Sequence, residues 1–424
     1  MKIKTDFKLF ALALISTEPY ALDLLFKPDF AFKERYEDNL RMQEKPIRSN
    51  FISTISPGLL FGYLADNNEL KTNFKWNQLI YHGDSDLDFA EKILNLNHQY
   101  KSELFRTDVL AGYSEESSIN TQLEIAGSGD VQTQVPRTTK FLTPSFTYNL
   151  NAKNAVQIGY SYSDVTFERQ DNLQNSLRYS DYTNQQLSGT LMHSYSERLN
   201  FNLTGAYSVF ESANESPGFI FGIIPVKTGF SQKSTTFSYQ AGFQYLFDEQ
   251  TQLNFSAGIR DTTTDASQYN KLANSDLFIN QTTNSSDTIG HVFSTNLTRK
   301  AEWGDFFISA GQQLNPASTG SQQTTTSFSG RARYNLDERW LAGINASYIS
   351  TEAISTFNNN SSVANNRTFT TLSPNIQWRW SDEVSFDLSY TYRQQVFENT
   401  SQSAIGNSVQ LQFSYQPQIN RQVK

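Results

Sequence analysis

Residues 193–212 read HSYSERLNFNLTGAYSVFES. A short polar segment, Ser-Glu-Arg at 196–198, stands directly before a run, 199–207, in which apolar residues or glycine occupy every second position. Alternation with a period of two is typical of a β-strand whose two faces meet different surroundings. Related stretches begin at Tyr245 (YLFDEQTQLNFSAGI), Arg333 (RYNLDERWLAGINASYIS) and Trp378 (WRWSDEVSFDLSYTY). This recurrence predicts a repeated unit, a polar turn followed by a two-faced strand.

The connections between the alternating runs differ in length in a regular way. Short connections fall near 65–69, 102–107, 150–154, 196–198, 247–251, 299–304, 335–339 and 380–383. Long polar connections fall near 37–49, 82–88, 114–139, 168–180, 211–232, 261–288, 315–325, 351–367 and 394–406. Short periplasmic turns and long extracellular loops are the pattern of outer-membrane barrels. Eight short and nine long connections join about eighteen strands, and an even number brings both termini to the periplasmic side.

The fold class that follows is all-β, a single transmembrane antiparallel β-barrel of about eighteen strands. The runs are about 10 to 14 residues long, whereas strands of soluble proteins average about 5–6 residues. Closure into a barrel is the only β arrangement that leaves no unpaired backbone edge in lipid. Aromatic residues near the strand ends fit interfacial girdles, namely Tyr195, Tyr207, Tyr245, Trp340, Tyr348, Trp378 and Trp380. A soluble all-β repeat protein is the alternative.

The composition supports strands with one apolar and one polar face. Charged residues make up 18% of the 424 residues and aromatic residues 14%, against roughly 25% charged residues in soluble proteins. The mean hydropathy of -0.52 argues against a helical membrane protein. The net charge of -8 argues against general nucleic-acid binding. There is no cysteine, so disulfides and thiolate metal sites are excluded.

The N-terminal stretch MKIKTDFKLFALALISTEPYALD is typical of a secretory signal. Three lysines, Lys2, Lys4 and Lys8, precede the short apolar run 9–15. We expect residues 1–21 to be a signal peptide and residues 22–424 to form the barrel; the alternative is a short buried helix. The expected location is the bacterial outer membrane, with outer-membrane lipid and lipopolysaccharide as surroundings.

No motif in the chain indicates catalysis or a cofactor. The histidines are too far apart in sequence for metal-ligand spacing; they are His82, His98, His193 and His291. The acidic stretch 84–88 departs from a calcium loop at Phe89 and Asn95, so a solvated loop is the better interpretation. Neither a nucleophile elbow nor a phosphate-binding loop occurs. We therefore predict no enzyme, and a Ser, His and acid within hydrogen-bond reach would reopen that question.

The polar strand faces carry the candidate functional residues. If the apolar faces meet lipid, the opposite faces line the lumen, and the basic residues there are Lys33, Arg35, Lys71, Lys75, Lys101, Arg106, Arg260, Arg331, Arg333, Arg379 and Arg393. Acidic residues on the same faces are Asp29, Glu103, Asp108 and Asp387. Rings of Arg and Lys favour anions, and Arg pairs with carboxylates such as those of uronic acids. Alternatively, these residues pair with acids and only fill the barrel, and a slip of one residue reverses a strand's faces.

Two stretches carry a family resemblance: YSERLNFNLTGAYSVFE, and FISTISPGLLFGYLADNNELKTNFKW from Phe51. Together they resemble the β-barrel porins associated with exosortase-linked exopolysaccharide gene clusters of Gram-negative bacteria. In that family, hairpins with a Ser-Glu-Arg-like turn repeat, and an LSPGL-like strand is matched here by residues 55–59. The resemblance implies no catalytic residues. One departure is that QPQINRQVK follows Tyr415, where outer-membrane proteins usually finish on an aromatic residue.

The function expected from the resemblance is a passive outer-membrane conduit for exopolysaccharide secretion. Its partners would be an anionic polysaccharide and periplasmic and inner-membrane export proteins. One alternative is a general or anion-preferring porin for small solutes, and another is a surface anchor for adhesion without transport. Loops 114–139 and 261–288 distinguish these functions, because loops folded inward would constrict the pore and loops projecting outward would offer a binding surface.

Overall fold

Eighteen β-strands make up almost all of the described chain in the computed structural model. The structure describes residues 23–46, 48–123, 134–168, 179–220, 224–273, 275, 277–354, 366–398 and 402–417. The predicted signal peptide, residues 1–21, lies outside the described residues. The strands are β1 (Asp23–Glu37), β2 (Asn50–Leu64), β3 (Asn68–His82), β4 (Phe89–Lys101), β5 (Phe105–Ser117), β6 (Pro136–Asn151), β7 (Asn154–Phe167), β8 (Asp181–Ser194), β9 (Leu199–Ile220), β10 (Ile224–Leu246), β11 (Thr251–Leu272), β12 (Phe278–Ala301), β13 (Gly304–Pro316), β14 (Gln322–Asn335), β15 (Trp340–Ala353), β16 (Arg367–Arg379), β17 (Val384–Phe397) and β18 (Gln402–Tyr415).

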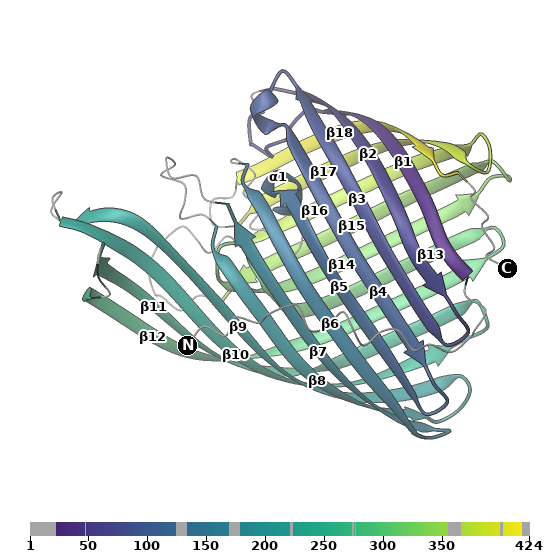
Figure 1. Ribbon diagram of the computed structural model, residues 1–424, viewed down its shortest axis with the longest axis horizontal. Coiled ribbons are helices and arrows are strands. Elements are labelled where there is room, and N and C mark those ends of the chain that lie inside the picture. The colour runs from purple at the N-terminus through teal and green to yellow at the C-terminus, as the bar shows by residue number, and fades with distance from the viewer. Residues whose placement is uncertain are drawn as a thin grey trace.

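The strands form one closed antiparallel barrel (Figure 1). Each strand pairs with the strands before and after it in the chain, and β1 pairs with β18 from Phe30↔Tyr415 to Glu37↔Ser408. Closure removes the sheet edges that lipid cannot hydrogen-bond. The predicted all-β barrel of about eighteen strands is confirmed. Among the described residues, no helix has the length and apolar character needed to cross a membrane.

The short polar segments between the alternating runs form the turns at one end of the barrel. Ser196 Oγ accepts hydrogen bonds from the backbone N–H groups of Arg198, at 3.3 Å, and Leu199, at 3.1 Å. The carboxylate of Asp337 caps its turn in the same way, with two backbone N–H groups at 2.7 Å. Such side-chain caps satisfy the backbone of a tight reversal. The short connections, the start of β1 at Asp23 and the end of β18 at Tyr415 therefore lie at the same end of the barrel, the periplasmic end.

Apolar and aromatic side chains cover the outer face of the barrel. Leu191 and Leu203 are exposed there, and the rings of Tyr207 and Phe237 contact each other with centroids 4.8 Å apart. Near the short turns, Trp340 stacks on Trp378 at 5.8 Å. A continuous exposed apolar band on a closed barrel is the lipid-facing surface of an outer-membrane protein. The chain is an outer-membrane β-barrel.

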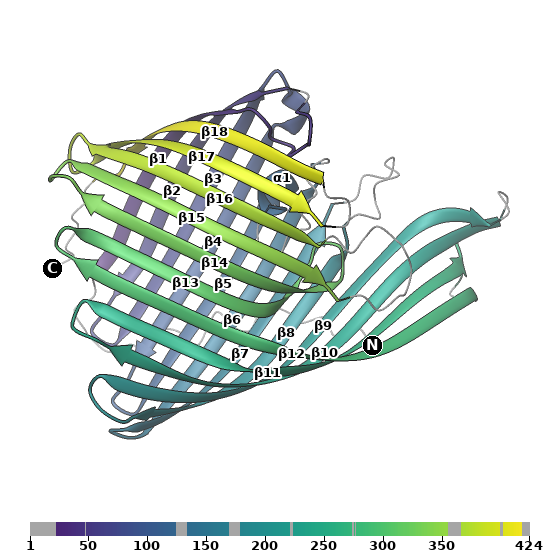
Figure 2. The ribbon, with the colours of Figure 1, turned by 180° about the vertical axis from the view of Figure 1, so that it is seen from behind.

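Four strands are longer than the sequence predicts. Strands β9 to β12 have 22, 23, 22 and 24 residues, whereas the other strands have 13 to 16. Figures 1 and 2 show these four strands, coloured teal to green, projecting beyond the rest of the barrel. The predicted loops at 211–232 and 261–288 are therefore wrong, because most of these residues are paired strand. In the projecting part, stretches such as RDTTTD at 260–265 are polar on both strand faces, so the hydrophobic alternation stops while the backbone pairing continues.

Candidate functional site

The register places the predicted basic residues on the face opposite the lipid-facing side chains. On β3, Phe74 and Trp76 do not share parity with Lys71 and Lys75. On β14, Phe328 and Tyr334 are exposed outward, and Arg331 and Arg333 alternate with them. The same alternation puts Arg379 on β16 and Arg393 on β17 on the inner face.

Arg331 and Arg333 share a single carboxylate in the lumen. Nε of Arg333 donates to Oδ1 of Asp305 at 2.7 Å, and Arg331 reaches the other oxygen of Asp305 only at 3.7 Å. The two arginine side chains are 48% and 47% exposed. Two guanidinium groups against one carboxylate leave a net positive charge on this wall. Asp305, which was not among the predicted acidic residues of the lumen, is the second residue of β13 and shares the inner face.

Other basic residues of the inner face differ in their pairing. Arg106 pairs with Asp108 at 2.7 Å, and Lys71 pairs with Glu69. Within the described ranges, no ion pair involves Lys75 or Arg379. The inner face therefore carries both paired and unpaired cations.

Two of the predicted lumen residues are buried and brace the barrel instead of facing open space. Arg260 on β11 donates to Thr262 at 3.3 Å and to Thr324 on β14 at 2.7 Å. Arg393 pairs with Glu37, a carboxylate that is 0% exposed, and Nε of Arg35 lies 3.4 Å from the same carboxylate. Glu37 thus joins the end of β1 to β17. Glu37 was not predicted to face the lumen, because the end of its strand falls in the predicted loop 37–49.

The loop-bearing end of the barrel is filled from inside by its own connections. The segment after β5 contains the short helix α1 (Ser118–Thr121), and Ile119 belongs to a buried cluster. The other members of that cluster are Leu40, Ile52, Leu79, Tyr81 and Leu87. Further along, Leu123 packs on a second cluster made by Met42, Phe369 and Ala404. This segment therefore extends from β5 toward β16 across the lumen.

The connection after β1 also lies inside the barrel, against β18. The Asp38 carboxylate accepts the backbone N–H of Asn407 at 2.6 Å and its side-chain amide at 2.8 Å. Asn39 donates to the carbonyl oxygen of Ile405 at 2.8 Å. The packing at Gly406 is close, since a Cβ at that position would lie 3.0 Å from the sulfur of Met42.

A third connection, residues 317–321 between β13 and β14, also contacts these segments; we call it the strap. The carbonyl oxygen of Ser318 accepts the backbone N–H of Ser180 at 2.8 Å. The Ser318 hydroxyl donates to Oε1 of Gln122 at 2.6 Å, and the Ser212 hydroxyl donates to the carbonyl oxygen of Gly320. The strap therefore ties the wall at β8 and β9 to the α1 segment. Two loops, 114–139 and 261–288, were expected to distinguish the candidate functions. The described part of 114–139 folds inward, and residues 124–133 lie outside the described residues. Residues 261–288 belong to the strands that project outward.

The acidic stretch 84–88 forms a short turn, η2 (Ser85–Leu87), between β3 and β4. The Asp88 carboxylate accepts the backbone N–H of Tyr81 at 2.7 Å, and Asp84 pairs with Arg48. In the part of the chain that the structure describes, no group of three or more His, Asp or Glu side chains could hold a metal ion. The stretch acts as a capped turn.

A serine, a histidine and a carboxylate do meet on the outer face of β1 to β3. Ser53 Oγ lies 2.7 Å from Nε2 of His82 and donates to Oε1 of Glu34 at 2.8 Å. The serine stands between the other two, whereas a catalytic triad has the acid orienting the base. Ser53 is paired on both sides in the sheet, with Glu34 and Ile80, so its backbone cannot form an oxyanion hole. The cluster has hydrogen-bond reach but lacks the geometry of acyl transfer.

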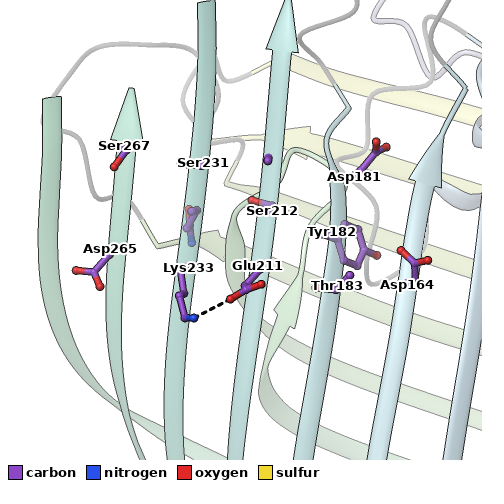
Figure 3. Close-up of a pocket in the computed structure, with 12 residues that line it drawn as sticks. Asp164, Asp181, Tyr182, Thr183, Glu211, Ser212, Ser231, Lys233, Asp265 and Ser267 are labelled. Atoms are coloured by element: carbon purple, nitrogen blue, oxygen red, sulfur yellow. Dashed lines mark ion pairs between the residues drawn. The ribbon is translucent and has the colours of Figure 1, made fainter. Parts of the chain in front are cut away.

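A hollow of about 560 Å³ lies where the projecting sheet leaves the barrel (Figure 3). Carboxylates line it from four strands, and Lys233 pairs with Glu211 at 2.7 Å; the remaining acids are Asp164, Asp181 and Asp265. Asp181 also accepts the backbone N–H of Phe167 at 2.8 Å. The excess of negative charge makes this hollow unsuitable for anions.

Similarity to known proteins lies at the level of the fold. No family model matches the chain, and no curated protein matches it. Among solved structures, the ferric citrate transporter FecA is 11% identical, with a TM-score of 0.45 over 88% of this chain; the chain spans 60% of that transporter. OpdK from Pseudomonas aeruginosa is 8% identical, with a TM-score of 0.43 over 93% of this chain and 99% of its own. The receptor Fiu from E. coli K12 is 8% identical, with a TM-score of 0.46 over 91% and 81%. All three are outer-membrane barrels, and the assignment of this chain to that class rests on its own closed sheet and apolar belt.

Proposed function

We propose that this barrel is an outer-membrane channel that favours anions, with acidic saccharides among its solutes. The observation that carries the proposal is the pair Arg331 and Arg333, half exposed on the inner wall with one carboxylate between them. Cationic side chains lining a pore attract anions and repel cations. Outer-membrane lipid and lipopolysaccharide would surround the apolar face.

The passive exopolysaccharide conduit implied by the resemblance needs one further step. A polymer chain passing outward would meet the α1 segment and the strap, which hydrogen bonds hold across the mouth. We infer that polymer export requires these connections to move aside, under the action of a periplasmic export partner. Small anions need only the space between the connections, so the anion-preferring channel is the function we favour.

The test is the reversal potential of the refolded protein in a planar bilayer under a salt gradient. We expect an anion-selective conductance, and the double variant Arg331→Ala plus Arg333→Ala should lose much of that selectivity. The matched control is Arg198→Ala plus Arg339→Ala, which removes the same charge from exposed short turns. A cation-selective conductance, or equal selectivity in both double variants, would contradict the proposal.

The surface anchor remains a second candidate because of the projecting strands β9 to β12. An anchor would use the part of this sheet that stands beyond the other strands. Shortening the β9–β10 and β11–β12 hairpins to the length of their neighbours should then abolish cell-surface adhesion and leave conductance intact. Unchanged adhesion would exclude this role.

A further inference from the structure

We propose that a hollow in the lumen wall binds one carboxylate-bearing sugar unit, of the uronic acid type. This inference rests on the proposed anion-preferring channel and names the solute class that its basic wall recognises. The hollow measures about 230 Å³ and is formed by β13 to β16. Its inward side chains are Phe307, Ser329, Arg331, Asn345, Ser347 and Thr371.

The register sorts these side chains into two adjacent rows. In one row Phe307 pairs with Arg331, which pairs with Asn345 on the next strand. In the other row Ser329 pairs with Ser347, which pairs with Thr371. Directly opposite residues have Cβ atoms about 4.5–5.5 Å apart. An aromatic ring, a guanidinium and an amide therefore stand beside a line of three hydroxyl groups.

Arg331 has donors to offer a ligand. Its one ion pair among the described residues, with Asp305, is long, at 3.7 Å, whereas Arg333 takes the same carboxylate at 2.7 Å. The planar guanidinium suits a carboxylate held by two parallel hydrogen bonds. A neutral sugar would leave this capacity unused, so the guanidinium selects for an acidic one.

The remaining groups match the rest of a sugar ring. Hydroxyl and amide side chains both donate and accept, as sugar hydroxyls do, and Ser329 has already one partner, Ser309 at 2.6 Å. The ring of Phe307 offers an apolar face to the C–H face of a pyranose. Chloride or phosphate would use Arg331 and the hydroxyl groups but gain nothing from the apolar ring, so the set as a whole fits an acidic sugar.

The size and openness of the hollow limit it to one unit of a chain. Its volume, about 230 Å³, falls below the roughly 300–1,000 Å³ of pockets that hold drug-sized ligands. Arg331 in its wall is half exposed, which indicates that the hollow opens into the lumen. Conduction requires sites that bind well enough to admit a solute and weakly enough to release it. A shallow site that binds a single sugar unit of the chain meets both conditions.

The experiment adds trigalacturonate to single channels in a planar bilayer and measures the residence time of each current block. We expect blocks by trigalacturonate and none by the neutral trisaccharide maltotriose. Arg331→Ala should shorten the residence time about tenfold, the effect of losing a charge-assisted hydrogen bond, and Phe307→Ala should also shorten it. The matched control Arg339→Ala removes an exposed arginine of the short turn between β14 and β15, outside the lumen, and should keep the block.

Arg331→Lys separates this inference from the channel function on which it rests. Lysine keeps the charge but not the two parallel hydrogen bonds, so anion selectivity should persist while the trigalacturonate block shortens. Folding of each variant is checked by heat-modifiable migration on gels, and calorimetry of detergent-solubilised protein with trigalacturonate measures binding where a channel is silent. Anion selectivity without binding of trigalacturonate would overturn the sugar site alone. Equal binding by wild type and Arg331→Ala, or by maltotriose and trigalacturonate, would also overturn it.

Discussion

The hydroxyl of Ser318 donates to the side-chain oxygen of Gln122 at 2.6 Å, across a sequence separation of 196 residues. This bond joins two connections that leave the barrel wall at β5 and at β13 and meet over the lumen. Among the described residues, contacts between its own loops therefore narrow the barrel at its loop-bearing end. If the barrel is the proposed channel, the frequency with which these contacts open should affect the current through it.

Ser318→Ala should make the mouth open more often. Losing one hydrogen bond costs about 0.5–1.5 kcal/mol, which corresponds to roughly two- to tenfold more frequent openings. The measurement is the frequency of brief current increases in single-channel recordings. Ser381→Ala, in the turn between β16 and β17 at the other end of the barrel, is the control. The same opening frequency in wild type and Ser318→Ala would show that the strap does not limit the current.

Glu37→Gln should strongly destabilise the barrel. The change leaves Arg393, itself only 14% exposed, without its buried counter-ion, and breaking a buried pair costs about 3–5 kcal/mol. The measurement is the free energy of unfolding in urea. Glu69→Gln breaks the exposed pair with Lys71 and should cost no more than about 1 kcal/mol.

A double variant tests the cause of that loss. Replacing the pair together, with Glu37→Leu and Arg393→Met, should recover much of the stability because the buried Arg393 charge is removed with its partner. Arg35, the other cation beside Glu37, is 27% exposed and keeps access to water. A double variant no more stable than Glu37→Gln would point to packing around β1 instead of charge burial.

The barrel could be predicted from sequence because lipid imposes a local pattern on every strand. The turn at Ser196 and the alternation after Leu199 are readable within a few residues, and the structure has both. The pattern ends where lipid ends. Beyond Val209 the strand continues through Glu211 and Ser212, polar on both faces, so nothing in the alternation separates the projecting strands from loops.

The contacts between the loops could not be predicted, because they join residues far apart in the chain. Nothing near Gln122 indicates Ser318, and nothing near Glu37 indicates Arg393. The basic residues of the inner face follow from strand parity. Which of them stay available to a solute depends on partners such as Asp305. This acid directly follows the predicted short connection 299–304 and pairs with Arg333, so strand parity would have placed it on the inner face.

Ser53 should not react with a fluorophosphonate probe. Its hydroxyl donates to Glu34 and its backbone is held in the sheet, so a covalent adduct would have no oxyanion hole. Ser53→Ala should instead reduce stability by about 1–3 kcal/mol, because it removes a partner of a half-buried carboxylate. Labelling that Ser53→Ala and His82→Ala both abolish would revive the enzyme hypothesis.

The turn at Asp248 should make unfolding depend on pH in the acid range. Hydrogen bonds from the backbone of Gln250, and from Thr251, lower the pKa of the Asp248 carboxyl below its ordinary 3.8. Because the folded-state pKa is the lower one, the charged carboxylate stabilises the fold above about pH 3.8, and this contribution is lost as the pH falls through the folded-state pKa. Asp248→Asn should therefore show a smaller difference between urea midpoints measured at pH 7 and pH 3 than the wild type. Asparagine still accepts the hydrogen bonds at 2.8 Å and 2.6 Å but does not titrate, so an unchanged difference would show that other acids set the acid stability of the barrel.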